Sequence, residues 1–344
     1  MAVITVNGPI DKCALGVTLP HEHLLIDLGF FTQAPPKEGN TPFFDKLSLQ
    51  NLRFVKKDPY LIRDNAVIDS EGEAVRELLL YRAAGGASVV EVTLDAIGRD
   101  PAALRRIGEK SGVNIIMGCG EYVAAAHSKE IGQKTDKQLA AQWIDEIKNG
   151  VGDTDVHPGV IGEIGTSAVI TENEWKAVRA AGVAAAETGY GVHIHASLYE
   201  TNGTEIARKL LTYGLAPRKI CIDHVDVDIK EDYILGLLEL GIIVEFDNFG
   251  KEFYISPRGG ATLTGRFAYD LERCQAIKKL TDRGYAAQIF ITNDICVKQL
   301  LATYGGFGYG HILDNIIPML KDVGVRDADI HKMTVETPAD FLDR

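Results

Sequence analysis

The sequence lacks the features that mark secreted, membrane-spanning and nucleic-acid-binding proteins. Its 344 residues include five cysteines, an odd number without a C-x-x-C pair, which argues against a disulfide framework. No apolar run approaches the about 18 residues of a membrane span, and no basic segment followed by an apolar one opens the chain. No basic run is present, and the net charge is −12. We therefore expect a cytoplasmic protein that binds neither membrane nor nucleic acid.

The chain also lacks internal boundaries. No low-complexity stretch and no Pro/Gly linker divides it, and its hydrophobic content of 46% suffices for one large core. We expect a single domain over residues 1–344, opened by a short β segment over 1–17. No G-x-G-x-x-G follows the first predicted strand, which argues against a dinucleotide site.

Strand patterns and helical patterns alternate along the whole chain. Short apolar runs, typical of strands covered on both sides, lie at 18–25, 88–94, 113–119, 158–164, 190–196, 219–225, 241–247 and 287–293. Helical spacing follows at 71–84, 101–110, 136–149, 172–187, 203–213, 229–239, 267–282 and 311–322. Eight alternations predict the α/β class and favour a (β/α)₈ TIM barrel over an open sheet.

One connection is unusually long. Residues 28–70 separate the first predicted strand from its helix, far more than a typical connection of this kind. A segment that leaves the downstream end of a barrel strand lies over the active face. We expect either a lid or part of a dimer contact, for which Phe30, Phe31 and Phe43 are candidates.

Potential metal ligands mark the downstream ends of five predicted strands. They are His21, His23, Glu163, His195, His224 and Asp294, four imidazoles and two carboxylates suited to divalent transition metals. A parallel barrel brings these strand ends together at one face. The sequence therefore predicts one metal site built from residues far apart in the chain, and with it a metal-dependent hydrolase.

The local patterns assign individual roles within this site. His21 and His23 alternate on a strand, so both imidazoles point to the same face. Glu163 has two oxygens with which to bridge two ions. His193 lies deeper than His195 on the same strand, so we expect it to be a hydrogen-bonded core residue or the partner of a ligand. Six ligands suffice for two ions that share Glu163 and keep positions for water or substrate.

These stretches resemble the phosphotriesterase family of the amidohydrolase superfamily, and most closely its phosphotriesterase-related and lactonase-like branch. The matching motifs are LPHEHLLID (19–27), GVIGEIGTS (159–167), HIHAS (193–197), CIDHVD (221–226), EFDNFG (245–250) and TNDI (292–295). The resemblance implies a TIM barrel with two divalent ions, usually zinc, with manganese, cobalt and iron as alternatives. It implies that His21, His23 and Asp294 hold the buried ion, that His195 and His224 hold the outer one, and that Glu163 bridges them.

The chain departs from the family pattern at two places. Glu163 replaces the carboxylated lysine of many members, and Asn248 stands where other members carry histidine or arginine. Tyr122 matches a tyrosine that lines the pocket of lactonase-like members. Because Asn248 removes a proton-relay or substrate contact, the substrate remains open between several classes.

The predicted mechanism uses a metal-bridging hydroxide and Asp294 as the group that takes and returns the proton. Asp226 is a candidate hydrogen-bond partner of a ligand histidine. Lys251, Arg258 and Arg266 are candidate anchors for an anionic substrate, beside Tyr122 and Asn248.

Three functions follow. The first is hydrolysis of a lactone or carboxylic ester, with weak activity on phosphotriesters. The second is hydrolysis of small N-acyl amino acids or N-acyl amines. The third is a metal-containing binding protein with little turnover. We expect a small-molecule substrate, and the resemblance implies a homodimer.

Overall fold

Eight parallel strands form the centre of the computed structural model, which describes residues 2–32, 43, 45–56, 58–255 and 265–344. In the sheet they follow the order β14-β11-β10-β9-β8-β7-β6-β3. Their bounds are β3 (Thr18–Glu22), β6 (Ser88–Glu91), β7 (Asn114–Cys119), β8 (Val160–Gly165), β9 (Val192–His195), β10 (Ile220–Ile222), β11 (Ile243–Phe246) and β14 (Ile289–Ile291). Each overlaps one of the eight predicted runs, which confirms the predicted TIM barrel.

The side chain of Glu22 joins the first and last strands of the sheet. Strands β14 and β3 lie in contact, and the hydroxyl of Thr292 donates to the carbonyl of His21 at 2.9 Å and to Glu22 Oε1 at 2.7 Å. The backbone amides of Asn293 and Ile295 donate to the same carboxylate at 2.9 and 2.8 Å. A fully buried carboxylate therefore replaces part of the backbone ladder between β3 and β14.

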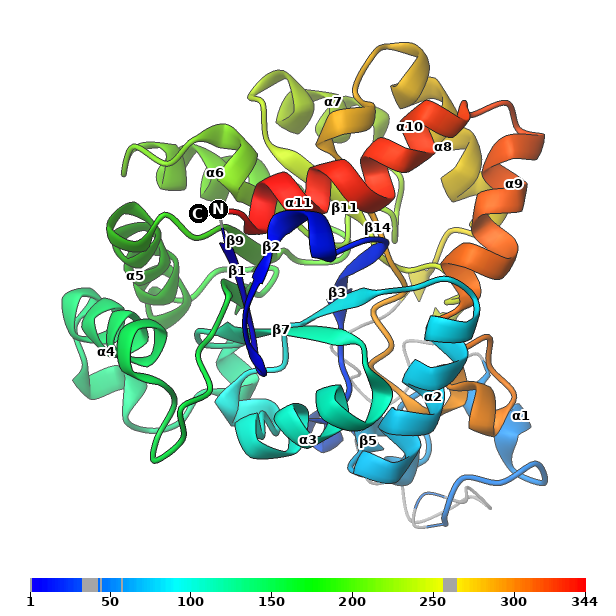
Figure 1. The fold of residues 1–344 in the computed structure, drawn as a ribbon, viewed down its shortest axis with the longest axis horizontal. Helices are drawn as coiled ribbons and strands as arrows, with labels where there is room; N and C mark the ends of the chain where they lie inside the picture. Colours follow the sequence, from blue (N-terminus) through cyan, green and yellow to red (C-terminus); the bar gives the residue numbers. More distant parts are fainter. Residues whose placement is uncertain (1, 33–42, 44, 57, 256–264) are drawn as a thin grey trace.

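Helices surround this barrel, as Figure 1 shows. Their bounds are α2 (Glu71–Ala83), α3 (Pro101–Ser111), α4 (Asp136–Asn149), α5 (Glu172–Thr188), α6 (Gly203–Leu211), α7 (Glu231–Glu239), α8 (Asp270–Asp282) and α9 (Ile317–Asp322). The π-helical turn η11 (Ile312–Ile316) precedes α9. All eight predicted helices are present, and the Thr171–Glu174 capping box opens α5. No helix in the described ranges combines the length and the apolarity that a membrane span needs.

Both chain termini close the end of the barrel at which the strands begin, opposite the downstream ends that carry the predicted ligands. The hairpin of β1 (Ala2–Thr5) and β2 (Gly8–Asp11) lies beside the C-terminal helix α11 (Thr337–Leu342) (Figure 1). The helix α10 (Asp327–His331) and the π-helical turn η12 (Lys332–Glu336) precede α11. Phe341 packs with Phe290 inside the barrel, at 5.3 Å between ring centroids. The predicted helices did not include α10 and α11. Pro338 interrupts the helical pattern of the sequence over α11, although a proline is tolerated in the first turn of a helix.

Strand β4 (Ile26–Asp27) lies just before the segment 28–70. The described part of the segment contains four short elements: η2 (Gly29–Phe31), α1 (Leu52–Val55), η3 (Arg63–Ala66) and β5 (Val67–Ile68). Strands β4 and β5 pair antiparallel and anchor both ends of the segment. Of the aromatic residues considered for a dimer contact, Phe43 is buried, Phe31 is half-buried and Phe30 is 37% exposed. The homodimer stays a prediction.

Replacing Glu22 by alanine removes the acceptor that joins β3 to β14, and we expect the free energy of unfolding to fall by about 3 kcal/mol. Urea denaturation measures the change. Glu109→Ala, on the exposed face of α3, is the matched control. A midpoint for Glu22→Ala equal to that of the control would contradict this role.

Candidate metal centre

The six predicted ligands converge at the downstream ends of their strands. His21 lies in β3 and His23 directly after it, Glu163 lies in β8, and His195 is the last residue of β9. His224 and Asp294 follow the ends of β10 and β14. His195 is the most accessible of the six, with 15% of its side chain exposed, whereas His21 is fully buried. The topology thus gathers residues from across the chain into one buried group.

Glu163 lies at the centre of this group. Its Oε1 atom lies 3.3 Å from Nε2 of His23, and its Oε2 atom lies 3.6 Å from Nε2 of His21. The same Oε2 lies 3.0 Å from Nδ1 of His195 and 3.7 Å from Nε2 of His224. One carboxylate therefore faces four imidazole nitrogens from three other strands.

Asp294 completes the inner half of the group. Its Oδ1 atom lies 3.1 Å from Nε2 of His23 and 3.8 Å from Nε2 of His21. Its other oxygen contacts the ammonium of Lys251. On the outer half, Nε2 of His224 lies 2.8 Å from Nδ1 of His195. The ligands thus form two sets, His21, His23 and Glu163 on one side and Glu163, His195 and His224 on the other, with Glu163 in both. Asp294 joins the first set through its contacts with His21 and His23.

Two candidate ligands have a left-handed backbone. His224 has φ +62° and Asp294 has φ +49°, a conformation that residues other than glycine rarely adopt. Gly162, next to Glu163, has φ +117°, and a Cβ atom there would lie 2.5 Å from the carbonyl oxygen of His193. The glycine of the GEIG motif therefore lets β8 approach β9 closely and aims Glu163 at the site.

The second ring nitrogen of three histidines lies close to an oxygen atom inside the barrel. Nδ1 of His23 lies 2.8 Å from the hydroxyl of Thr93, and Nδ1 of His224 lies 3.0 Å from Oδ2 of Asp247. Nδ1 of His21 lies 2.9 Å from Oε2 of Glu245. These contacts turn the Nε2 atoms toward Glu163, as is usual for histidines that bind a metal.

A cavity of about 430 Å³ opens over this group. The segment before α2 contributes Leu28, Phe31 and Tyr60 to its wall. This placement favours the role of a cover over that of a dimer contact. The hydroxyl of Tyr122 lies 3.4 Å from Nδ1 of His195, and its ring packs edge-on against that imidazole at 4.9 Å. The cavity is otherwise lined mainly by apolar side chains, including Val123, Leu198, Phe253, Phe267 and Val297.

The predicted substrate contacts separate into two groups. Asn248 and Lys251 line the cavity, and both are buried. Arg266 does not line it: half of its side chain is exposed, and its guanidinium pairs with Glu272 on the surface. Arg258 lies outside the described residues.

Asp226 does not have the predicted position beside a ligand histidine. Its carboxylate accepts from Arg273 Nε at 2.8 Å and from Asn248 Nδ2 at 2.7 Å, and the carboxylate beside His224 is that of Asp247. Arg273 is fully buried and also donates to Asp270 at 3.0 Å. Asp226 therefore holds the loop that carries Asn248 and does not itself contact a ligand histidine through these bonds.

Four residues whose side chains contact the ligand histidines were not predicted from the sequence: Thr93, Asp223, Glu245 and Asp247. The spacing of Glu245 and Asp247 contains a signal, since residues two apart on a strand face the same side, and both lie in the otherwise apolar predicted strand 241–247. A buried carboxylate without a partner is costly. Two buried carboxylates at this spacing therefore indicate that each has a partner, such as a ligand histidine.

Comparison with known proteins identifies the family. Residues 1–342 match the phosphotriesterase family. The chain belongs to the phosphotriesterase family. The N-acetyltaurine hydrolase of Xenopus tropicalis is 35% identical over 342 residues, which cover 99% of this chain and 97% of that protein. The resemblance inferred from the motifs is confirmed, and the chain is a hydrolase of this family.

Solved structures agree with this assignment. A resiniferatoxin-binding protein from Rhodobacter sphaeroides superposes with a TM-score of 0.95 at 30% identity, covering 99% of this chain and 95% of that one. The phosphotriesterase homology protein from Escherichia coli, complexed with phosphate in its active site, superposes with a TM-score of 0.79 at 26% identity, covering 97% and 100%.

The ligand set of this phosphotriesterase-family hydrolase fits a pair of divalent ions. Atoms bound to a common ion at about 2.0–2.2 Å lie roughly 3–3.6 Å from one another, and the contacts around Glu163 fall near this range. The fully buried Nε2 of His21 finds no hydrogen-bond partner among the described residues. An ion in the inner set would satisfy it.

Protons compete with such ions for the same atoms. Burial disfavours the charged ring of His23, but contacts with Asp294 and Glu163 outweigh burial and raise the pKa of His23 to about 9. Burial likewise opposes the charge of Glu163, yet the neighbouring histidines hold the pKa of this carboxyl well below its usual range. At neutral pH the imidazole of His23 in the ion-free site therefore retains its proton.

We expect divalent-ion binding to the ion-free hydrolase to release protons below about pH 9, because His23 must become neutral to bind a metal. The apparent affinity should rise by about tenfold per pH unit for each proton released. Calorimetric titration in buffers of different ionisation enthalpy measures the release. A binding enthalpy that is the same in every buffer would contradict the expectation, and His23→Asn, which removes the titrating ring, is the control.

Proposed function

We propose that this chain hydrolyses the amide bond of small N-acyl amines or N-acyl amino acids whose amine part carries an anionic group. The observation that carries the proposal is the pairing of Lys251 with Asp294 at the wall of the cavity, directly beside the convergent ligand set. The relatives named N-acetyltaurine hydrolase support it, because N-acetyltaurine is an amide with a sulfonate on its amine side.

We further propose that the two ligand sets hold two divalent ions, with zinc first and manganese, cobalt or iron as alternatives suited to the same donors. His21, His23 and Asp294 would hold the inner ion, His195 and His224 the outer one, and Glu163 both. When bound, such ions would polarise the amide carbonyl and make a water acidic enough to attack it near neutral pH.

In this proposal Asp294 moves the proton. Its Oδ1 atom faces His21 and His23 across the inner set. Burial opposes its charge, but Lys251 outweighs burial and keeps the pKa of Asp294 low, so the carboxylate is available as a base. An amide nitrogen leaves only when it is protonated. Asp294 therefore takes a proton from the attacking water and delivers it to the departing nitrogen.

In this proposal Lys251 binds the anion of the leaving amine. It is 3% exposed, and it is the one lysine or arginine among the described residues that line the cavity. Because its ammonium contacts Asp294, it lies within a few ångströms of the position where the nitrogen is protonated. A sulfonate or carboxylate one or two carbons from that nitrogen can reach it.

The two other functions predicted from the sequence are less well supported. Hydrolysis of a lactone or carboxylic ester was the leading prediction, and the names of the sequence relatives favour the amide alternative instead. A binding protein without turnover has support from the name of the Rhodobacter sphaeroides structure alone. A panel of amides, esters, lactones and phosphotriesters distinguishes the three, and a metal-loaded protein inactive on all of them would favour binding.

Asp294→Asn should lower kcat for amide hydrolysis by at least about 100-fold, because the variant has no group to carry the proton. Steady-state kinetics on N-acetyltaurine measure the loss, and thermal unfolding shows that the fold is retained. Ser197→Ala, another polar residue of the cavity wall, is the control. Unchanged turnover in Asp294→Asn would exclude the proposed proton transfer.

Lys251→Met should lower kcat/KM about 10- to 100-fold more for N-acetyltaurine than for neutral N-acetylethylamine, because a charge-assisted contact is lost only with the anionic substrate. Comparing the two substrates separates anion binding from any effect on Asp294, which lowers both rates together. Arg266→Met, which removes an exposed cation outside the cavity, is the control. An equal loss for both substrates would contradict the anchor role.

A further inference from the structure

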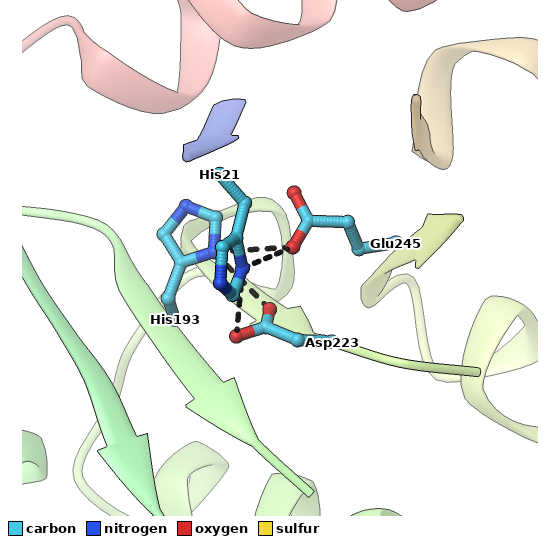
Figure 2. Close-up of side chains that lie close together, drawn as sticks. All are labelled: His21, His193, Asp223 and Glu245. Carbon is cyan, nitrogen blue, oxygen red and sulfur yellow. Dashed lines mark hydrogen bonds and ion pairs between the residues drawn. The ribbon is translucent and has the colours of Figure 1, made fainter. Parts of the chain in front are cut away.

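A second layer of ionisable side chains lies directly beneath the metal centre. His193, Asp223 and Glu245 surround the ring of His21 on the side away from Glu163, and Figure 2 shows the four side chains facing one another. They come from four strands or strand ends, and each is at most 1% exposed. The layer therefore lies inside the barrel and has no access to substrate.

The contacts in this layer form a chain that ends at His21. Oε2 of Glu245 lies 2.9 Å from Nδ1 of His21, and Oδ2 of Asp223 lies 3.6 Å from the same nitrogen. Nδ1 of His193 lies 3.1 Å from Oδ1 of Asp223 and 3.7 Å from Oε2 of Glu245. Two carboxylates thus share one side of His21, and His193 spans them from below.

The direction of the hydrogen bond follows from the metal centre. An imidazole whose Nε2 atom serves as a ligand carries its proton on Nδ1. Glu245 then accepts that proton at hydrogen-bond distance, so the layer is occupied by a hydrogen bond and does not offer four free donor atoms to a third ion. A carboxylate acceptor makes the opposite nitrogen a stronger donor to a metal and fixes the orientation of the ring.

We propose that Glu245, Asp223 and His193 act as positioning residues that strengthen the binding of the inner ion through His21. This inference rests on the proposed metal centre. The outer ion does not share the layer, because His224 has its own carboxylate, Asp247, at 3.0 Å. The other inner histidine, His23, has only the neutral hydroxyl of Thr93 at 2.8 Å. Of the two inner imidazoles, His21 is therefore the one that carboxylates strengthen.

The layer rests on aromatic rings, which keep it rigid. The ring of His193 stacks on Phe290 at 6.0 Å and meets the ring of Phe341 edge-on at 5.0 Å between centroids. Phe341 belongs to α11, which closes the lower end of the barrel. The position of His21 is thus determined by packing that extends to the C-terminal helix.

The test measures each ion separately, without substrate. His195→Ala weakens the outer set and leaves the inner one, whereas His23→Ala weakens the inner set and leaves the outer one. Glu245→Gln is added to each background, and Co²⁺ affinity is measured by the absorption of the bound ion. We expect Glu245→Gln to lower Co²⁺ affinity about 10- to 100-fold in the His195→Ala background and less than about twofold in the His23→Ala background.

Asp247→Asn is the matched control, with the reverse pattern expected because it acts through His224. Equal losses in both backgrounds, or no loss in either, would overturn the inference, as would three Co²⁺ ions per wild-type chain.

If the wild-type chain binds no divalent ion, the proposed metal centre and this inference fail together. If it binds two ions and Glu245→Gln changes the affinity for neither, only this inference fails. Should Glu245→Gln not fold, as circular dichroism would show, Asp223→Asn in the same backgrounds replaces it, with a smaller loss confined to the inner ion expected.

Discussion

The contact of Glu163 with four imidazoles is the constraint around which the rest of the site is arranged. Its two oxygens face His21, His23, His195 and His224, which lie in or just after the strands β3, β9 and β10. A carboxylate buried at this depth is tolerated only among such partners. The close approach of β8 to β9 at Gly162 and the left-handed backbone of His224 both serve to bring these atoms together.

Different residues of the barrel close its sheet and hold the ligands of this centre. Glu22 joins β3 to β14, and Phe341 fills the lower end, so both stabilise the closed barrel. The layer of His193, Asp223 and Glu245 lies between the aromatic rings at the closed end of the barrel and the ligand His21. A buried polar network of this kind is stable only when its members are paired, which ties the ligand geometry to the packing below it.

The sequence alone predicted most of the fold and the ligand set, and less of what surrounds them. Short, nearly continuous apolar runs predicted the eight strands, and the downstream position of His21, Glu163 and Asp294 predicted the convergence. Helix α11 was missed because Pro338 hides a short helix that only its tertiary packing stabilises. Arg266 and Lys251 looked alike as loop cations, and only the fold shows that one points to solvent and the other to Asp294. Asp226 and Asp247 could not be told apart, since which carboxylate meets His224 depends on how β10 and β11 are aligned.

The apolar wall of the cavity belongs to residues that take no part in holding the barrel closed. Val123, Leu198, Phe253 and Val297 lie beyond the ends of the barrel strands, on connecting segments, and the ligands lie at or near the strand ends themselves. Exchange of these wall residues alters the shape offered to a substrate at little cost to the closure at Glu22. The architecture is therefore evolvable: one hydrolytic centre can acquire new substrates through changes in its loops while the inherited core stays as it is.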